Sequence, residues 1–134
     1  MFLKFDSQDD RRKYGGSCFV ELQFCKLPRE SSLKEILGGI EYWRDDSLYV
    51  HGDSPIYQEY KDIFGFGILD NGVEDGEENV EEGLFNYYGV TYYKPELIDE
   101  IIERARDARP DGYATLIAWL EEAKQYNGFY ISGL

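Results

Sequence analysis

The sequence predicts an α+β fold in which a mixed, mostly antiparallel sheet is covered by about four helices. Three observations lead to this expectation. Aromatic and β-branched runs alternate with amphipathic stretches, but without the strict strand–helix repeat of a parallel sheet. The 134 residues are a usual size for one domain and can bury a core without disulfides or metal. No linker or internal repeat divides the chain, so residues 1–134 are expected to form a single domain.

The first half of the chain is expected to hold three strands and two helices. Residues 17–25 are rich in aromatic and branched side chains and make the clearest strand. Ser32 and Glu35 form an S-x-x-E capping box at the start of a helix that is expected to reach Trp43. Gly38-Gly39 weakens this helix, which either ends there or is closely approached by another element. The other expected elements are strands at residues 1–5 and 47–51 and a helix at residues 55–64, with Ser54 as its N-cap.

The segment of residues 70–82 has the strongest composition bias. It holds seven acidic residues and no basic one, and its only apolar side chains are Val73 and Val80. We expect an exposed loop here, because so many like charges repel one another. Residues 84–93 then have strong strand propensity, with a bulge or turn at Gly89.

Two helices and a short strand are expected in the last third. Pro95 suits the first turn of a helix whose apolar side chains follow the helical period until Pro110 stops it. Asp111 is expected to cap the second helix, which ends before Asn127-Gly128, a good C-terminal signal. Residues 129–131 are expected to form the final strand.

The net charge narrows the classes of partner. It is −13, from 27 acidic and 14 basic residues. A field of this sign repels nucleic acid and anionic membranes and attracts basic proteins, although plain solubility would explain the same charge. The N-terminal residues lack the apolar core of a secretory signal, and no apolar run is long enough to span a bilayer. We therefore expect a cytoplasmic protein that binds neither nucleic acid nor membrane.

The residues offer little support for a disulfide or a metal site. Cys18 and Cys25 fall on opposite faces of one expected strand, so they cannot bridge each other and are expected to be free thiols. One histidine and two separated cysteines cannot make a structural zinc site. In the acidic segment a calcium loop would need Asp or Asn where Gly72 stands, and Gly where Asp75 stands. No metal site and no cofactor are expected.

No catalytic residue is expected either. His51 is the only histidine, and His51-Gly52-Asp53 would suit a base oriented by a carboxylate. A histidine that ends a strand and is satisfied there explains the same residues. Gly65-Phe66-Gly67 lacks the third glycine, or the Lys-Ser/Thr, of a phosphate-binding loop. The 27 acidic residues leave glycosidase-type carboxylate pairs open, but nothing marks one pair as special.

Two tyrosine pairs follow the acidic segment. Tyr87-Tyr88 and Tyr92-Tyr93 would each split across the two faces of a strand, so that one member packs in the core and the other is exposed. Exposed tyrosines beside acidic residues suit a basic protein partner, although all four could simply cover the sheet. The candidate partner-binding residues are Asp70, Glu74, Asp75, Glu77, Glu78, Glu81, Glu82, Tyr88 and Tyr92.

Three stretches resemble a known group of proteins. They are residues 86–96 (NYYGVTYYKPE), 114–120 (ATLIAWL) and 126–134 (YNGFYISGL). They are similar to the C-terminal half of small bacterial immunity proteins that accompany polymorphic toxins, including those of contact-dependent growth inhibition. A vaguer likeness extends back through residues 42–50. The resemblance carries over no partner-contact residues.

The resemblance implies a cytoplasmic protein that binds and neutralises one cognate toxin domain, often a nuclease, in a 1:1 complex. A nuclease is basic where it grips its substrate, so an acidic inhibitor could occlude that surface. The acidic segment could plug the active site, or the protein could bind elsewhere and block delivery or folding of the toxin. A general acidic adaptor with several partners is the alternative, and a small carboxylate-dependent hydrolase near His51 is a more distant one.

Overall fold

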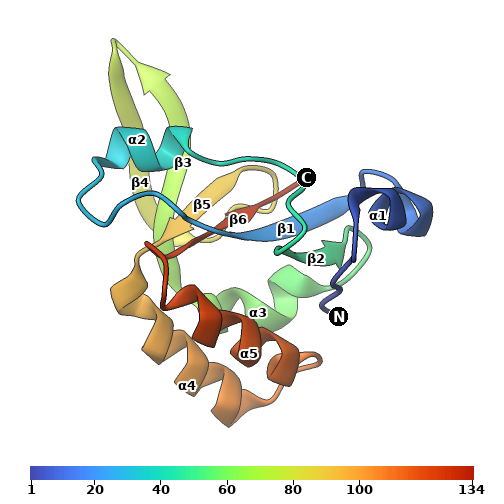
Figure 1. Cartoon of the computed structure of the whole chain (residues 1–134). Helices are drawn as coiled ribbons and strands as arrows, with labels where there is room; N and C mark the ends of the chain where they lie inside the picture. Colours follow the sequence, from blue (N-terminus) through green and yellow to red (C-terminus); the bar gives the residue numbers. More distant parts are fainter.

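The computed structural model describes residues 1–134 and is built around one sheet of six strands (Figure 1). The strands are β1 (Phe19–Phe24), β2 (Leu48–His51), β3 (Phe66–Glu74), β4 (Glu77–Leu84), β5 (Val90–Tyr93) and β6 (Phe129–Ser132). The helices are α1 (Gln8–Gly15), α2 (Leu33–Gly38), α3 (Ile56–Phe64), α4 (Ile98–Ala108), α5 (Tyr113–Ala123) and the short 3-10 helix η1 (Pro95–Leu97). The strand order is β2-β1-β6-β5-β3-β4, and every neighbouring pair is antiparallel. The predicted α+β fold is confirmed.

Helices cover the two faces of the sheet unequally (Figure 1). α3, α4 and α5 lie on one face, where alternate strand residues such as Leu22 form the main core. Trp119 of α5 stacks on Phe24 of β1, with 4.3 Å between the ring centres. The opposite face has a smaller core, in which residues of α2 pack on Tyr92 and Tyr130. The sheet is therefore buried on both faces near its centre, while β4 at its edge is largely exposed.

The predicted N-terminal strand is absent, and a helix that was not predicted follows it. Residues 1–5 do not form a strand, and only Leu3 makes an isolated bridge, to Tyr49. The charged residues that follow form α1, whose N-cap Ser7 accepts a 3.2 Å hydrogen bond from the backbone N–H of Asp10. Acidic side chains in the first turn and basic ones in the last complement the helix dipole. α1 has no strong apolar stripe, so its N-cap and the charges in its first and last turns are the features that favour a helix here.

The predicted capping box forms at Ser32, but α2 is short. The helix ends at Gly38 instead of reaching Trp43. Both alternatives expected at Gly38-Gly39 hold. The helix ends there, and another part of the chain approaches closely, because a Cβ on Gly39 would lie 2.6 Å from a methyl carbon of Leu27. The chain then continues as an irregular segment to β2.

The acidic segment is a β-hairpin and not the predicted loop. β3 and β4 pair up to Glu74 opposite Glu77, with one irregularity after Asp70. The connection is Asp75-Gly76, in which the two φ angles are 52° and 82°. Positive φ at both positions is the geometry of a type I′ turn, which matches the twist of a hairpin and favours Asp-Gly. The acidic composition of the segment concealed a turn signal that the sequence contains.

The predicted strand at residues 84–93 is divided. β4 ends at Leu84, and β5 begins at Val90 after a turn that includes Asn86 and Gly89. β4 and β5 are both antiparallel to β3 and lie on opposite sides of it, so residues 85–89 connect two strands that run in the same direction. β5 then pairs with β3 on one side and with β6 on the other.

The last third follows the prediction closely. η1 and α4 follow Pro95 as expected. Gly112, and not Asp111, is the N-cap of α5. Gly128 has φ +81°, and a Cβ there would collide with the carbonyl oxygen of Tyr93, so the turn into β6 requires glycine. Every helix is too short or too polar to cross a membrane.

Candidate protein-binding surface

The hairpin of β3 and β4 carries all the predicted acidic contact residues, and it extends beyond the rest of the sheet (Figure 1). Five of the seven carboxylate residues are exposed, and Asp70 and Glu78 are partly exposed. None of the ion pairs in the protein involves a hairpin residue. The hairpin therefore presents a concentrated negative charge that no basic side chain of the protein pairs with.

One face of the hairpin is entirely polar toward its tip. Strand alternation and the register place Glu74, Glu77 and Glu81 on this side, together with Asn71 and Asn79. The Asn71 side chain donates a 3.2 Å hydrogen bond to Glu81, and the Asn79 side chain donates one of 3.4 Å to Glu74. We call this side, which is continuous with the α3 face of the sheet, the polar face.

The opposite side, which we call the mixed face, is continuous with the α2 face of the sheet. It carries Phe66, Val73 and Val80, whose side chains are 64%, 65% and 36% exposed. Its acidic residues are Asp70, Glu78 and Glu82. Sequence reasoning noticed the two valines but could not assign them to a side, because an irregular loop has no faces.

The two candidate tyrosines lie in different environments. Tyr88 is 76% exposed in the turn after β4. Tyr92 is 2% exposed, and its hydroxyl donates a 2.6 Å hydrogen bond to the carbonyl oxygen of Asn127. Burial raises the pKa of the Tyr92 hydroxyl, which therefore remains protonated. A side chain this buried cannot contact a partner, so Tyr92 does not belong to the binding surface.

An open pocket of about 770 Å³ lies beside the base of the hairpin. One wall is the turn after β2 with the start of α3, and the other is the turn between β4 and β5. Its aromatic lining consists of Tyr57, Phe85, Tyr87 and Tyr88, and Asp53 is its only charged residue. We call it the aromatic pocket. Sequence reasoning missed it because the fold alone brings these two turns together.

Hydrogen bonds hold the walls of the aromatic pocket in place. The Tyr87 hydroxyl donates to the carbonyl oxygen of Gly52, which joins the two walls directly. The backbone N–H of Leu134 donates to the Tyr87 carbonyl oxygen at 2.8 Å. A Cβ on Gly133 would collide with that oxygen, so glycine is needed for this close approach. Burial, with Tyr88 and Asp53 nearby, raises the pKa of Tyr87 and keeps its hydroxyl a donor.

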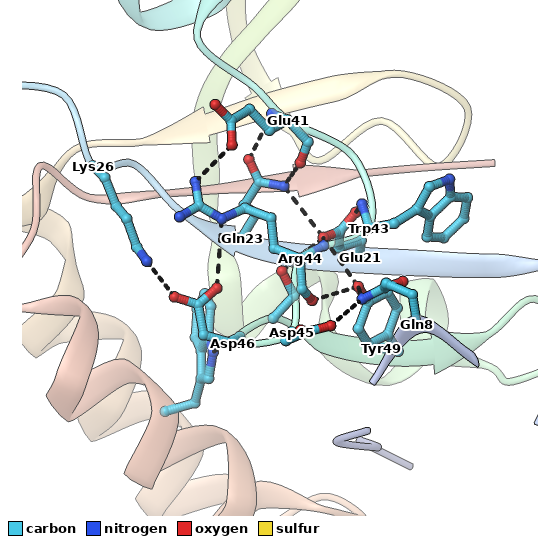
Figure 2. Close-up of polar contacts among 12 residues, drawn as sticks. Gln8, Glu21, Gln23, Lys26, Glu41, Trp43, Arg44, Asp45, Asp46 and Tyr49 are labelled. Carbon is cyan, nitrogen blue, oxygen red and sulfur yellow. Dashed lines mark hydrogen bonds and ion pairs between the residues drawn. The ribbon is translucent and has the colours of Figure 1, made fainter. Parts of the chain in front are cut away.

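Figure 2 shows a second polar cluster, centred on Glu21 of β1. Glu21 is 1% exposed, and its carboxylate accepts hydrogen bonds from the backbone N–H groups of Trp43 (3.0 Å) and Arg44 (3.1 Å). The hydroxyls of Ser47 (2.7 Å) and Tyr49 (3.4 Å) donate to it as well. The buried charge is thus satisfied by several donors, and it fastens the segment between α2 and β2 across the sheet.

Neighbouring side chains extend this anchoring (Figure 2). The side-chain amide of Gln23 makes two hydrogen bonds with the backbone of Glu41. Its nitrogen donates to the Glu41 carbonyl oxygen, and its oxygen accepts a 2.8 Å hydrogen bond from the Glu41 N–H. The guanidinium of Arg11 lies 3.9 Å from the centre of the Trp43 ring. Sequence reasoning missed this cluster, although the alternation of Glu21 and Gln23 with apolar residues was a signal for two polar side chains on one face.

No hydrogen bond joins His51 to Cys18 or Cys25. His51 ends β2, as predicted, and both polar contacts of its imidazole are with Asp53. Its Nδ1 accepts a 3.2 Å hydrogen bond from the Asp53 backbone N–H and lies 3.6 Å from a carboxylate oxygen. Cys18 and Cys25 are both free, as predicted. No group of three or more His, Cys, Asp or Glu side chains is arranged to hold a metal ion.

The chemically distinctive surface of the protein is therefore the hairpin with the aromatic pocket at its base. Its carboxylates make no ion pair within the protein and can attract a partner of opposite charge. Its exposed aromatic side chains and its pocket are features of protein-binding sites. No protein-family model, curated protein or solved structure matches the chain.

Proposed function

We propose that the protein is a cytoplasmic immunity protein, which binds one cognate toxin domain in a 1:1 complex and neutralises it. The toxin domain is basic, with a nuclease as the best candidate. The immunity protein occludes its active or substrate-binding surface electrostatically. The observation that carries this proposal is the projecting hairpin, whose seven acidic residues make no ion pair within the protein.

The charge of the hairpin supports a basic partner on physical grounds. Opposite potentials speed the encounter of two proteins and disfavour partners of the wrong charge. A surface that grips nucleic acid is rich in Lys and Arg, because it must neutralise phosphates. A narrow acidic ribbon can enter such a surface where a broad acidic face could not. Occlusion of this kind requires no chemistry from the inhibitor.

The shape of the hairpin supports insertion and not only long-range attraction. The tip residues Glu74, Asp75 and Glu77 are exposed and lie beyond the covered part of the sheet. A paired ribbon holds these carboxylates in fixed positions, so the hairpin loses less conformational entropy on binding than a flexible loop would. The polar face and the mixed face then offer two different sides to the walls of a cleft.

Co-expression tests the function. The product of the neighbouring gene is expressed in cells alone and together with this protein. We expect growth arrest without the protein and normal growth with it. The purified pair should elute as a 1:1 complex whose affinity falls as salt increases. A neighbouring product that is harmless when expressed alone would contradict the proposal.

A general acidic adaptor would use the same hairpin but would bind several partners. The same purified protein distinguishes the two functions. An immunity protein should bind its cognate domain far more tightly than unrelated basic proteins such as lysozyme or histones. Equal affinity for all of them at physiological salt would favour the adaptor.

A further inference from the structure

We propose that the aromatic pocket binds one arginine side chain of the partner, so that the protein recognises a specific residue as well as a field of positive charge. The inference rests on the proposed function for the identity of that partner. The binding of arginine itself depends only on the pocket. It would make the pocket the anchor of the complex and the hairpin its electrostatic guide.

The charge around the pocket favours a cation. Asp53 is its only charged lining residue, and its side chain is 96% exposed. The Asp53 carboxylate forms no ion pair with a Lys or Arg of the protein, and it lies 3.6 Å from the His51 Nδ1, which accepts a hydrogen bond from the Asp53 backbone N–H. A guanidinium that enters the pocket can therefore pair with Asp53 without displacing a resident Lys or Arg.

The aromatic lining favours arginine over lysine. Tyr87 and Tyr88 meet edge to face with 5.1 Å between their ring centres, and Tyr88 is largely exposed. A planar guanidinium can stack on such a ring and still form two parallel hydrogen bonds with a carboxylate, whereas an ammonium group can do neither as well. Lys61 already lies 5.7 Å from the centre of the Tyr57 ring, which leaves Tyr87 and Tyr88 as the rings for an incoming cation.

The pocket is continuous with the acidic hairpin. Leu69 of β3 lines the pocket, and its cross-strand partner Glu81 lies on the polar face. Glu74 and Glu77 follow farther out on the same face. A basic segment of the partner can therefore lie along the polar face and place an arginine in the pocket at its base.

The pocket is also preformed. The bond from Tyr87 to Gly52 joins its walls, and the Asn86 side chain accepts a 2.9 Å hydrogen bond from the backbone N–H of Tyr88. An anchor side chain that enters an ordered pocket costs the protein little conformational entropy. The pocket of about 770 Å³ is open to solvent, so its lining can be reached from outside.

Short peptides test the pocket without the toxin. The isotope-labelled protein is titrated with acetyl-Gly-Arg-Gly-amide, with its lysine counterpart and with its citrulline counterpart, which keeps the shape of arginine but not the charge. We expect the arginine peptide to bind weakly, with amide shift changes centred on residues 52–58 and 85–88. The citrulline peptide should bind at least tenfold more weakly, and the lysine peptide several-fold more weakly.

Variants locate the site. Asp53→Asn and Tyr88→Ala should each lower the affinity for the arginine peptide about tenfold. Asp107→Asn and Tyr42→Ala are matched controls, since both residues are exposed and lie outside the pocket. They should change the affinity less than twofold. Circular dichroism confirms that all four variants are folded.

The outcomes for pocket and function are separable. Equal binding of the arginine and citrulline peptides, or shift changes spread over the hairpin and α4, would overturn the arginine pocket. A toxin complex that still forms in that case leaves the immunity function intact. Selective arginine binding by the pocket, combined with a harmless neighbouring gene product, would overturn the function and leave the pocket standing.

Discussion

The hydroxyl of Tyr87 donates a hydrogen bond to the carbonyl oxygen of Gly52 and so joins two turns that are far apart in the sequence into one pocket. Removal of this hydroxyl tests how much the binding surface depends on preorganisation. Tyr87→Phe should lower the free energy of unfolding by about 1 kcal/mol, the usual net contribution of one hydrogen bond. It should also lower the affinity for the arginine peptide several-fold. Urea denaturation and peptide titration measure the two effects, and unchanged peptide affinity would show that the pocket does not need this bond.

Charge removal from the hairpin tests its role as the electrostatic guide. We expect the combined substitution of Glu74, Asp75, Glu77 and Glu78 by their amides to weaken the toxin complex at least tenfold at low salt, about 1.4 kcal/mol or more. The loss should appear mainly in the association rate and should shrink as salt screens the charges. Stopped-flow mixing at several salt concentrations measures it.

A matched variant removes the same number of charges elsewhere. Glu59, Glu103, Asp107 and Glu122 are exposed on helices and belong to no ion pair. Their amide variant should keep most of the association rate, because all four charges lie outside the hairpin. Equal losses in both variants would mean that net charge alone, and not the hairpin, attracts the partner.

Alanine substitutions at two glycines compare a left-handed backbone with an unstrained one. Gly76 has φ +82° with open space around it, so Gly76→Ala should cost about 1 kcal/mol of stability through the left-handed backbone alone. Gly38 ends α2, also with open space around it, and Gly38→Ala should stabilise the protein by about 0.5–1 kcal/mol. Urea midpoints that move in the same direction would contradict this reading of the two backbones. The toxin complex should weaken only for Gly76→Ala, which disturbs the hairpin tip.

The Glu21 cluster predicts a stability effect without a binding effect. Glu21→Gln replaces an acceptor oxygen by a donor where backbone N–H groups and a serine hydroxyl point inward. We expect a loss of about 1.5–3 kcal/mol, the range for hydrogen bonds to a charged group. Glu41→Gln, at an exposed side chain whose only ion pair is 3.4 Å long, should cost less than about 0.5 kcal/mol. Folded protein of either variant should bind the toxin normally, and a binding defect in Glu21→Gln alone would place this cluster in the interface.

Alkaline titration tests the buried tyrosines. Burial raises the pKa of Tyr49, Tyr60, Tyr92, Tyr93 and Tyr130 above the usual 10.0. Because the folded pKa exceeds the unfolded one, their contribution to stability is complete below pH 10 and is lost as the pH rises through the folded values. Absorbance at 295 nm should show these buried tyrosines ionising only as circular dichroism reports unfolding. Ionisation of all twelve tyrosines while the protein is still folded would contradict this.

The sequence predicted those elements whose signals are local. The capping box at Ser32, the proline before α4 and the glycine before β6 each act within a few residues, and each appears at its expected place. The hairpin was missed although Asp75-Gly76 is a favourable turn pair, because the charge pattern was given more weight than the turn. The acidic contact residues were thus identified correctly as exposed but without their arrangement in space.

The rest of the binding surface depends on contacts between distant parts of the chain. Tyr88 and Tyr92 belong to identical Tyr-Tyr pairs, and only the turn that separates β4 from β5 leaves one exposed and buries the other. The aromatic pocket requires the turn after β2 to meet the turn after β4, and the strand order determines that meeting. No local pattern in either turn carries this information.

The position of β6 has a consequence for synthesis. This strand is the last along the chain, yet it lies between β1 and β5 and is the only link between the two halves of the sheet. A nascent chain that has emerged as far as α5 can form hairpins and helices, but it cannot close its core. A chain that lacks β6 would therefore keep its sheet in two unconnected parts, and under the proposed function it would not protect cells.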